Sequence, residues 1–183
     1  MSEETRKRKK LFFALWPDHA IRHQLIEASK AYRAGGVTMP ARNLHITLVF
    51  IGYVDATQQQ CLKVAASQVQ GMPFTLTLDT IDHFGQRILW MGCKQVPEGL
   101  FTLHNLLTES LVEHCEFNPE KHRYRPHVTL QRKIRKPLQT DLEHSIEWPV
   151  RRFSLVESIP PVKRFAQPCY RPLQHWELGS HFG

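Results

Sequence analysis

A four-residue pattern, His-x-Thr-Leu, occurs twice in this chain, at residues 45–48 and 127–130. Both copies lie among β-prone residues and far apart in the sequence. In a β-strand, residues i and i+2 point to the same face, so each histidine has a threonine beside it at roughly 7 Å along the chain. Each copy therefore presents one imidazole and one hydroxyl to the same object.

These side chains suit chemistry at phosphorus. Imidazole titrates near pH 6.5, so one copy can accept a proton while the other donates one. A threonine hydroxyl is a short neutral donor for a phosphoryl oxygen. Two such units facing each other would hold a phosphodiester between a base and an acid, as in-line displacement requires. A lone copy is more often structural, but the repetition favours His45 and His127 as catalytic residues and Thr47 and Thr129 as substrate ligands.

The segments LFFALWP, NLHITLVFIG and RPHVTLQR, together with the doubled motif, carry a family resemblance. The chain resembles the 2H phosphoesterase superfamily and, within it, the RNA 2′,3′-cyclic phosphodiesterases, also called 2′-5′ RNA ligases (LigT-like), over most of residues 11–135. The resemblance implies a bilobal α+β fold, with two mostly antiparallel sheets, helices outside and both motifs lining a central cleft. It also implies metal-independent hydrolysis of 2′,3′-cyclic phosphate termini to a 2′-phosphate.

The resemblance further implies individual roles. His127 would activate water as the base and His45 would protonate the departing 3′-oxygen. Arg132 stands where the family places an arginine that could clamp the phosphate or stack on the terminal base. Its odd offset from His127 puts it on the wrong face of a regular strand, so this role requires a bulge, a strand end or a twist. Phe50 has the same offset from His45, and both base stacking and core packing are open to it.

Three functional interpretations follow. The first is the RNA-end phosphodiesterase, with ATP-independent 2′-5′ joining as a side activity, because the chain shows neither a P-loop nor a nucleotidylating lysine motif. The second keeps the chemistry on another substrate, such as an ADP-ribose cyclic phosphate or a 2′-5′ oligoadenylate, since the motifs contact only phosphate. The third is a non-catalytic RNA-binding module, although Lys or Arg would serve that purpose without paired histidines.

Net charge and composition limit the kinds of partner that the protein is expected to bind. The formal net charge of +7 favours an anionic partner and is compatible with RNA. Five of the basic residues lie in RKRKK at 6–10, within a segment, residues 1–10, that we expect to be a disordered tail. The expected partner is RNA with cyclic phosphate ends, tRNA fragments among the candidates, and we expect the protein to be a monomer.

We expect no cofactor and no metal, because the other histidines form no HExxH pattern. Cysteines 61, 93, 115 and 169 show neither CxxC nor paired spacing, which favours a reducing, cytoplasmic location. No stretch approaches the length of a membrane span.

Hydrophobic periodicity predicts a single α+β domain over residues 11–183. Strict alternation at 74–81 and the run 87–91 predict a hairpin around Phe84-Gly85. Pro126 cannot donate a ladder hydrogen bond, so we expect the second motif strand to start there, with His127 at an open end. The other predicted elements are strands at 11–16, 44–51, 150–159 and 171–178, and helices from Asp18 toward Gly35-Gly36, at 58–70 and at about 99–115.

Overall fold

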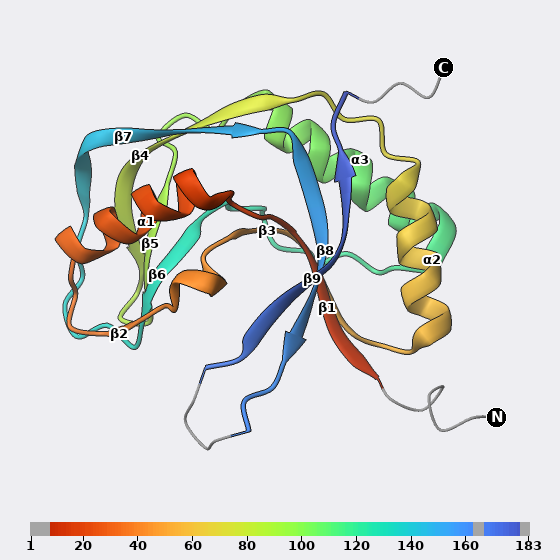
Figure 1. The fold of residues 1–183 in the computed structure, drawn as a ribbon, viewed down its shortest axis with the longest axis horizontal. Helices are drawn as coiled ribbons and strands as arrows, with labels where there is room; N and C mark the ends of the chain where they lie inside the picture. The colour runs from red at the N-terminus through yellow and green to blue at the C-terminus, as the bar shows by residue number, and fades with distance from the viewer. Residues whose placement is uncertain (1–7, 163–166, 180–183) are drawn as a thin grey trace.

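The computed structural model describes residues 8–162 and 167–179, and these form an α+β fold (Figure 1). Within them lie three α-helices, α1 (His19–Ala31), α2 (Ala56–Ser67) and α3 (Glu98–Cys115), and a short 3₁₀ helix, Ala41–Asn43. The strands are β1 (Lys9–Leu15), β2 (Val37–Thr38), β3 (Ile46–Val54), β4 (Phe74–Phe84), β5 (Ile88–Gly92), β6 (Val128–Arg132), β7 (Thr140–Val150), β8 (Arg152–Ile159) and β9 (Cys169–Glu177).

The described strands form one antiparallel sheet of nine strands, in the order β7-β4-β5-β6-β3-β1-β8-β9, with β2 paired to β6. The α+β class is therefore confirmed, whereas the expectation of two separate sheets is wrong. Among the described residues, the two halves are joined through one registered pair, Ile46 of β3 with Val128 of β6. The strands diverge beyond this pair, which preserves two lobes within one sheet.

The helices begin where side chains can cap them. The Asp18 carboxylate accepts from the backbone N–H of Ile21 at 2.8 Å and starts α1. Asp55 and Gln58 form a reciprocal capping box at the start of α2. Such caps satisfy backbone donors that have no partner inside the helix. The three predicted helices are confirmed, although α1 ends at Ala31, before the paired glycines.

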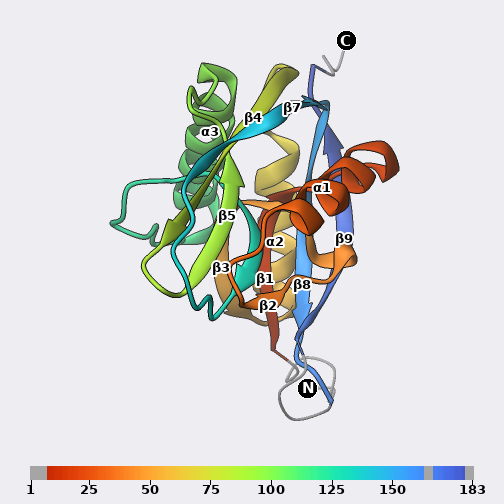
Figure 2. The same cartoon turned by 90° about the vertical axis from the view of Figure 1, so that its left-hand side faces the viewer.

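The helices divide between the two halves of the sheet (Figures 1 and 2). Helix α1 contacts β7, whereas α2 contacts β3 and β9, and α3 contacts both β3 and α2. Buried apolar side chains from both halves belong to one core cluster, including Phe13 and Leu15 of β1 and Leu76 and Leu78 of β4. The α-helices thus hold the sheet from outside and leave the motif strands at its centre.

The buried amide of Gln131 ties the α1–β2 connection to the second motif strand. Its Oε1 accepts from the N–H groups of Ala34 and Gly36 at 3.0 and 3.3 Å, and its Nε2 donates to the Tyr32 carbonyl. A Cβ at Gly36 would lie 2.6 Å from the Arg132 carbonyl oxygen, so only glycine allows this close approach.

Two parts of the sequence behave differently from expectation. Lys9 and Lys10 pair with Val54 and Tyr53 as the start of β1, so the predicted tail ends sooner; residues 1–7 lie outside the described residues. Strand β7 was not predicted, because Leu142 is its one apolar residue before Ile146 and Pro149 lies among its last residues. Pro149 is tolerated because β7 is an edge strand.

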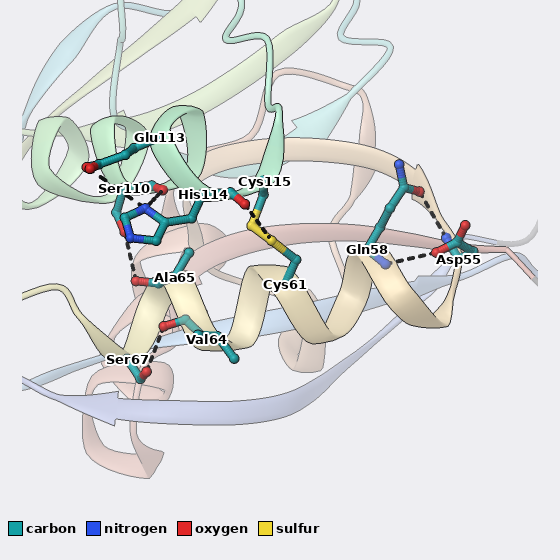
Figure 3. Close-up of a disulfide and its surroundings, with 10 residues drawn as sticks. All are labelled: Asp55, Gln58, Cys61, Val64, Ala65, Ser67, Ser110, Glu113, His114 and Cys115. Carbon is teal, nitrogen blue, oxygen red and sulfur yellow. Dashed lines mark hydrogen bonds and ion pairs between the residues drawn. A yellow bond between two sulfur atoms is a disulfide. The ribbon is translucent and has the colours of Figure 1, made fainter.

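Cys61 of α2 and Cys115 at the end of α3 form a disulfide (Figure 3). Their Cα atoms are 5.8 Å apart although 54 residues separate them, because the two helices pack side by side. The Ser110 hydroxyl also donates to the Ala65 carbonyl between these helices. The expectation of unpaired, reduced cysteines is thus wrong for this pair, while Cys93 and Cys169 are free. None of the helices in the described ranges is long and apolar enough to cross a bilayer.

Candidate active site

The two motif strands meet at the pair of Ile46 and Val128, which forms the seam of the sheet. Both side chains are buried in the core. Since successive residues of a strand point to opposite faces, the residues on either side of this pair project away from the core. These flanking residues are the histidines and threonines of the two motifs.

Antiparallel pairing relates the two motifs by a local two-fold rotation. Thr47 lies across from His127, and His45 lies across from Thr129. The two histidines are therefore diagonal neighbours on one face. Each histidine stands beside the threonine of its own copy and opposite that of the other.

A β-bulge follows the first motif. Strand β3 has one extra residue, Leu48, between the residues that pair with Phe13 and Ala14 of β1. The Leu48 side chain is buried, and the bulge reverses the phase of the strand beyond it. Phe50 therefore points to the face of His45, and it is 42% exposed. Its position settles the choice left open by the sequence in favour of the cleft over the core.

The second motif has the same kind of β-bulge at the same position. Strand β6 has one extra residue, the buried Leu130, between the residues that pair with Leu89 and Trp90 of β5. The bulge brings Arg132 onto the face of His127. The geometric condition attached to Arg132 is met, and the fourth residue of each His-x-Thr-Leu motif is the one that bulges.

A cavity of about 270 Å³ lies over this face of the seam. It is lined by all six side chains proposed from the sequence, namely His45, Thr47, Phe50, His127, Thr129 and Arg132. Lys10, Phe12, Met39, Ile88, Ser158 and Tyr170 complete its described lining. Among these residues two are cations and none carries a carboxylate, so the cavity suits an anion.

His45 is enclosed by aromatic side chains. The Trp16 ring is stacked on the imidazole with centroids 5.6 Å apart, and Phe12 and Tyr170 lie at 5.0 and 5.2 Å. The Nδ1–H of His45 donates to the Asn43 carbonyl at 2.6 Å. In this tautomer Nε2 carries the lone pair and accepts the Thr47 hydroxyl at 3.1 Å.

His127 is held in the same way. Its Nδ1–H donates at 2.8 Å to the carbonyl of Arg125, which is again the residue two positions before the histidine. Phe84 meets the ring edge-on at 5.0 Å and Trp90 lies at 6.2 Å. Both imidazoles are therefore fixed by a backbone carbonyl on one nitrogen, which leaves the other nitrogen for chemistry.

Burial lowers the pKa of both imidazoles. The pKa of His45 falls to about 4, chiefly through desolvation, and the charges of His127 and Arg132 lower it further against the opposing hydrogen bond to Asn43. The pKa of His127 is lowered by desolvation too, with smaller contributions from Arg132 and Arg125 against its own backbone hydrogen bond. Both rings are then neutral at pH 7 until an anion binds between them.

Asn43 is a site residue that the sequence did not reveal. Its buried side chain donates to the Pro168 carbonyl at 2.7 Å and accepts from the Tyr170 N–H at 3.3 Å. It thereby fixes the start of β9, which brings Tyr170 against His45. Its place two residues before the motif is the one signal that could have indicated this role; Tyr170 and Lys10 carry none.

No group of three or more His, Cys, Asp or Glu side chains in the described ranges is arranged to hold a metal ion. The remaining histidines of these ranges lie on α1, β4, α3, β7 and β9 and in the segment before β6. The ring of His104, on α3, lies against the ring of Tyr124. The Nδ1 atom of His175, on β9, is hydrogen-bonded with the hydroxyl of Ser154, on β8.

Comparison with known proteins identifies relatives along most of the chain. The family model for the 2′-5′ RNA ligase superfamily matches residues 16–159. The RNA 2′,3′-cyclic phosphodiesterase of Escherichia coli (strain K12) is 30% identical, over 93% of this chain and 97% of its own length. The Archaeoglobus fulgidus protein of the same name is 30% identical, over 92% of this chain and 99% of its own length.

Structural comparison agrees with the sequence comparison. The crystal structure of E. coli LigT complexed with 3′-AMP superimposes with a TM-score of 0.84 at 30% identity, covering 95% of this chain and 100% of that one. The match spans both lobes and both motif strands, so the resemblance noted in the sequence is confirmed. This chain belongs to the 2′-5′ RNA ligase superfamily.

Proposed function

We propose that this protein is an RNA 2′,3′-cyclic phosphodiesterase that hydrolyses cyclic phosphate termini to a 2′-phosphate by acid–base catalysis without a metal. The observation that carries the proposal is the placement of both histidines and both threonines on one face of the seam, around one cavity that also holds Arg132 and Lys10. Relatives named for this activity at 30% identity support the substrate class.

The terminal nucleotide would occupy the 270 Å³ cavity. The hydroxyls of Thr47 and Thr129, one from each motif, would donate to the two non-bridging oxygens of the cyclic phosphate. Arg132 and Phe50, brought to the same face by the paired bulges, would hold the phosphate charge and stack on the base. The complex of E. coli LigT with 3′-AMP supports a nucleotide as the ligand.

Hydrolysis would proceed by in-line displacement. The Nε2 of His127 takes a proton from water as the water oxygen attacks phosphorus. The bond from phosphorus to the 3′-oxygen breaks, and His45 donates a proton to that oxygen. The ribose keeps a 2′-phosphate and regains its 3′-hydroxyl. His45 lies among three aromatic rings, where we place the nucleoside, and His127 also lines a second cavity, from which we expect water to enter.

Binding of the anionic substrate favours the protonated form of His45, which the free protein lacks at neutral pH. The acid must carry a proton, yet burial holds the pKa of His45 at about 4. A phosphate anion bound beside the ring favours the charged imidazolium and raises that pKa. Protonation of His45 is thus coupled to substrate binding.

The same acid–base pair would join RNA ends if a ribose 5′-hydroxyl replaced water, giving a 2′-5′ linkage without ATP. RNA fragments with cyclic phosphate ends, tRNA fragments among them, are the proposed substrates, and the protein would act as a cytoplasmic monomer. The cation content of the cavity, Lys10 and Arg132, is consistent with such an anionic partner.

The decisive experiment is turnover of a 2′,3′-cyclic nucleotide and of a cyclic-ended oligonucleotide in the presence of EDTA. We expect hydrolysis of both and a 2′-phosphate product. Loss of activity with EDTA would contradict the metal-independent mechanism. A protein that binds RNA but turns over neither substrate would be a binding module, and selective activity on an ADP-ribose cyclic phosphate or a 2′-5′ oligoadenylate would change the substrate assignment.

A further inference from the structure

A second cavity, of about 560 Å³, adjoins the first one. It lies between α3 and the segment 117–127 that leads into β6. The two cavities share Thr47, Phe50 and His127 in their linings. Among the described residues, His45, Thr129 and Arg132 line the smaller cavity alone. The phosphorus position therefore lies at the boundary, with His127 facing both sides.

The lining of the larger cavity combines rings and cations. Phe101 and His104 of α3 face Phe117 and Tyr124 of the opposite segment. The charged side chains of the lining are Arg123 and Arg125, which add positive charge, and Glu120, which adds one carboxylate. Aromatic faces and arginines are the groups on which nucleic-acid bases stack. Its volume lies within the range of small-molecule sites.

The side chains that form the wall of the larger cavity are held in place by contacts within the protein, without a ligand. The Tyr124 hydroxyl donates to the Thr47 carbonyl at 3.0 Å, and the Tyr124 ring lies 4.0 Å from that of His104. The disulfide from Cys61 to Cys115 holds the end of α3, directly before the segment begins. A preformed wall lowers the entropy lost when a ligand binds.

The stereochemistry of displacement assigns an occupant to this cavity. The entering oxygen must approach phosphorus roughly opposite the departing 3′-oxygen. If the nucleoside bearing the 3′-oxygen fills the smaller cavity, as the proposed function requires, the entering group comes past His127 from the larger one. Water can enter by this route, and so can a nucleoside with a free 5′-hydroxyl.

We propose that the 560 Å³ cavity is the acceptor subsite, which binds the nucleoside on the 5′-hydroxyl side of a 2′-5′ linkage, in joining and in cleavage. In joining, the 5′-oxygen bonds to phosphorus, its proton passes to His127, the bond to the 3′-oxygen breaks and His45 protonates that oxygen. In cleavage the same steps run backwards and yield a cyclic phosphate and a 5′-hydroxyl. No ATP or other co-reactant is consumed.

The test separates the acceptor from the cyclic end. Arg123 and Phe101 are exposed side chains on opposite walls, so Arg123→Ala and Phe101→Ala should leave the fold intact. We expect each to lower kcat/KM for cleavage of a 2′-5′-linked diadenosine, and for joining of adenosine to a cyclic end, by about tenfold. Hydrolysis of a 2′,3′-cyclic mononucleotide should stay within about twofold of the parent, because water needs no stacking contact. Arg33→Ala, on the exposed end of the α1 region outside both cavities, is the matched control.

The outcomes are distinct. Equal loss of hydrolysis and 2′-5′ cleavage in the variants would overturn the subsite, since the residues would then merely support His127. Loss confined to cyclic-ended oligonucleotides, with cyclic mononucleotides unaffected, would assign the cavity to the upstream RNA strand and also overturn it. A parent that hydrolyses cyclic ends but neither joins nor cleaves 2′-5′ linkages would refute the subsite and leave the proposed function standing. A parent that hydrolyses no cyclic phosphate would refute both.

Discussion

The two motif copies have the same local geometry and different surroundings. In both, the histidine donates from Nδ1 to the carbonyl two residues earlier, and the leucine of the motif forms the bulge. His45, however, lies among three aromatic rings, whereas His127 contacts two and also borders the second cavity. The motif alone gives a symmetric pair of imidazoles, and the neighbouring side chains make the pair asymmetric.

Removing each histidine tests this asymmetry most strongly. We expect His45→Ala and His127→Ala each to lower kcat for a 2′,3′-cyclic nucleotide by about 10²- to 10⁴-fold, because each removes a proton-transfer group. With a 4-nitrophenyl phosphodiester, whose leaving group needs no acid, His45→Ala should recover most of the rate and His127→Ala should not. Equal recovery by both variants would contradict the assigned roles. Unchanged thermal unfolding would show that both variants fold.

The threonines are expected to have the next largest effect. Thr47→Val and Thr129→Val should each lower kcat/KM about 10- to 100-fold, the loss expected for a hydrogen bond to a charged oxygen. Thr47→Val should have the larger effect, because the Thr47 hydroxyl also contacts Nε2 of His45. Serine at either position should restore most of the rate. Full activity of Thr129→Val would exclude its hydroxyl as a phosphate donor.

The pH dependence follows from the lowered pKa of both histidines. Reaction requires one neutral and one protonated imidazole, and the fraction of free protein in that state falls tenfold per pH unit above the higher pKa. We therefore expect kcat/KM to decline with a slope of −1 above about pH 6.5. The decline of kcat should begin at a higher pH than that of kcat/KM, because bound phosphate raises the pKa of His45. A kcat/KM that is constant from about pH 6.5 to 8.5 would contradict this coupling.

The buried side-chain amides of Asn43 and Gln131, one near each motif histidine, are expected to show the smallest difference between the two halves. Asn43→Ala and Gln131→Ala should each lower the free energy of unfolding by about 1–3 kcal/mol, because each leaves buried backbone groups without a partner. Asn43 holds Tyr170 against His45, so its variant should also lower kcat/KM several-fold. Gln131 holds the connection before β2, and its variant should retain kcat/KM. Denaturant unfolding and steady-state kinetics on the same samples make the comparison.

Local patterning was sufficient for the helices and for most strands. The alternation at 74–81 and the stripe of leucines in α3 each have a clear period, and the structure has the elements that these patterns predict. Strand β7 has a weaker signal, since polar or charged residues fill all but one of its first six positions and Pro149 would be excluded from a central strand. Its position at the sheet edge, which the sequence does not reveal, is what permits it.

The site was predictable only in its chemical groups. The doubled motif identified both histidines and both threonines, and the strand phase showed that Arg132 needed a bulge. Which residue bulges depends on the registers with β1 and β5, which are tertiary facts. The pairing of Cys61 with Cys115 and the contact of Tyr170 with His45 likewise join segments far apart in sequence, so no local pattern could reveal them.

The strands on the two sides of the seam are synthesised in a fixed order, and this order determines when the site is completed. Apart from β2, the strands on the His127 side come from the continuous stretch β4 to β7, whereas the His45 side combines β1 and β3 with the late strands β8 and β9. The wall around His45 is incomplete until Tyr170 has left the ribosome and its N–H has met Asn43. A nascent chain therefore has its motif strands long before it has a closed site, and the last contacts to form are those that enclose the first of the two motif histidines to be made.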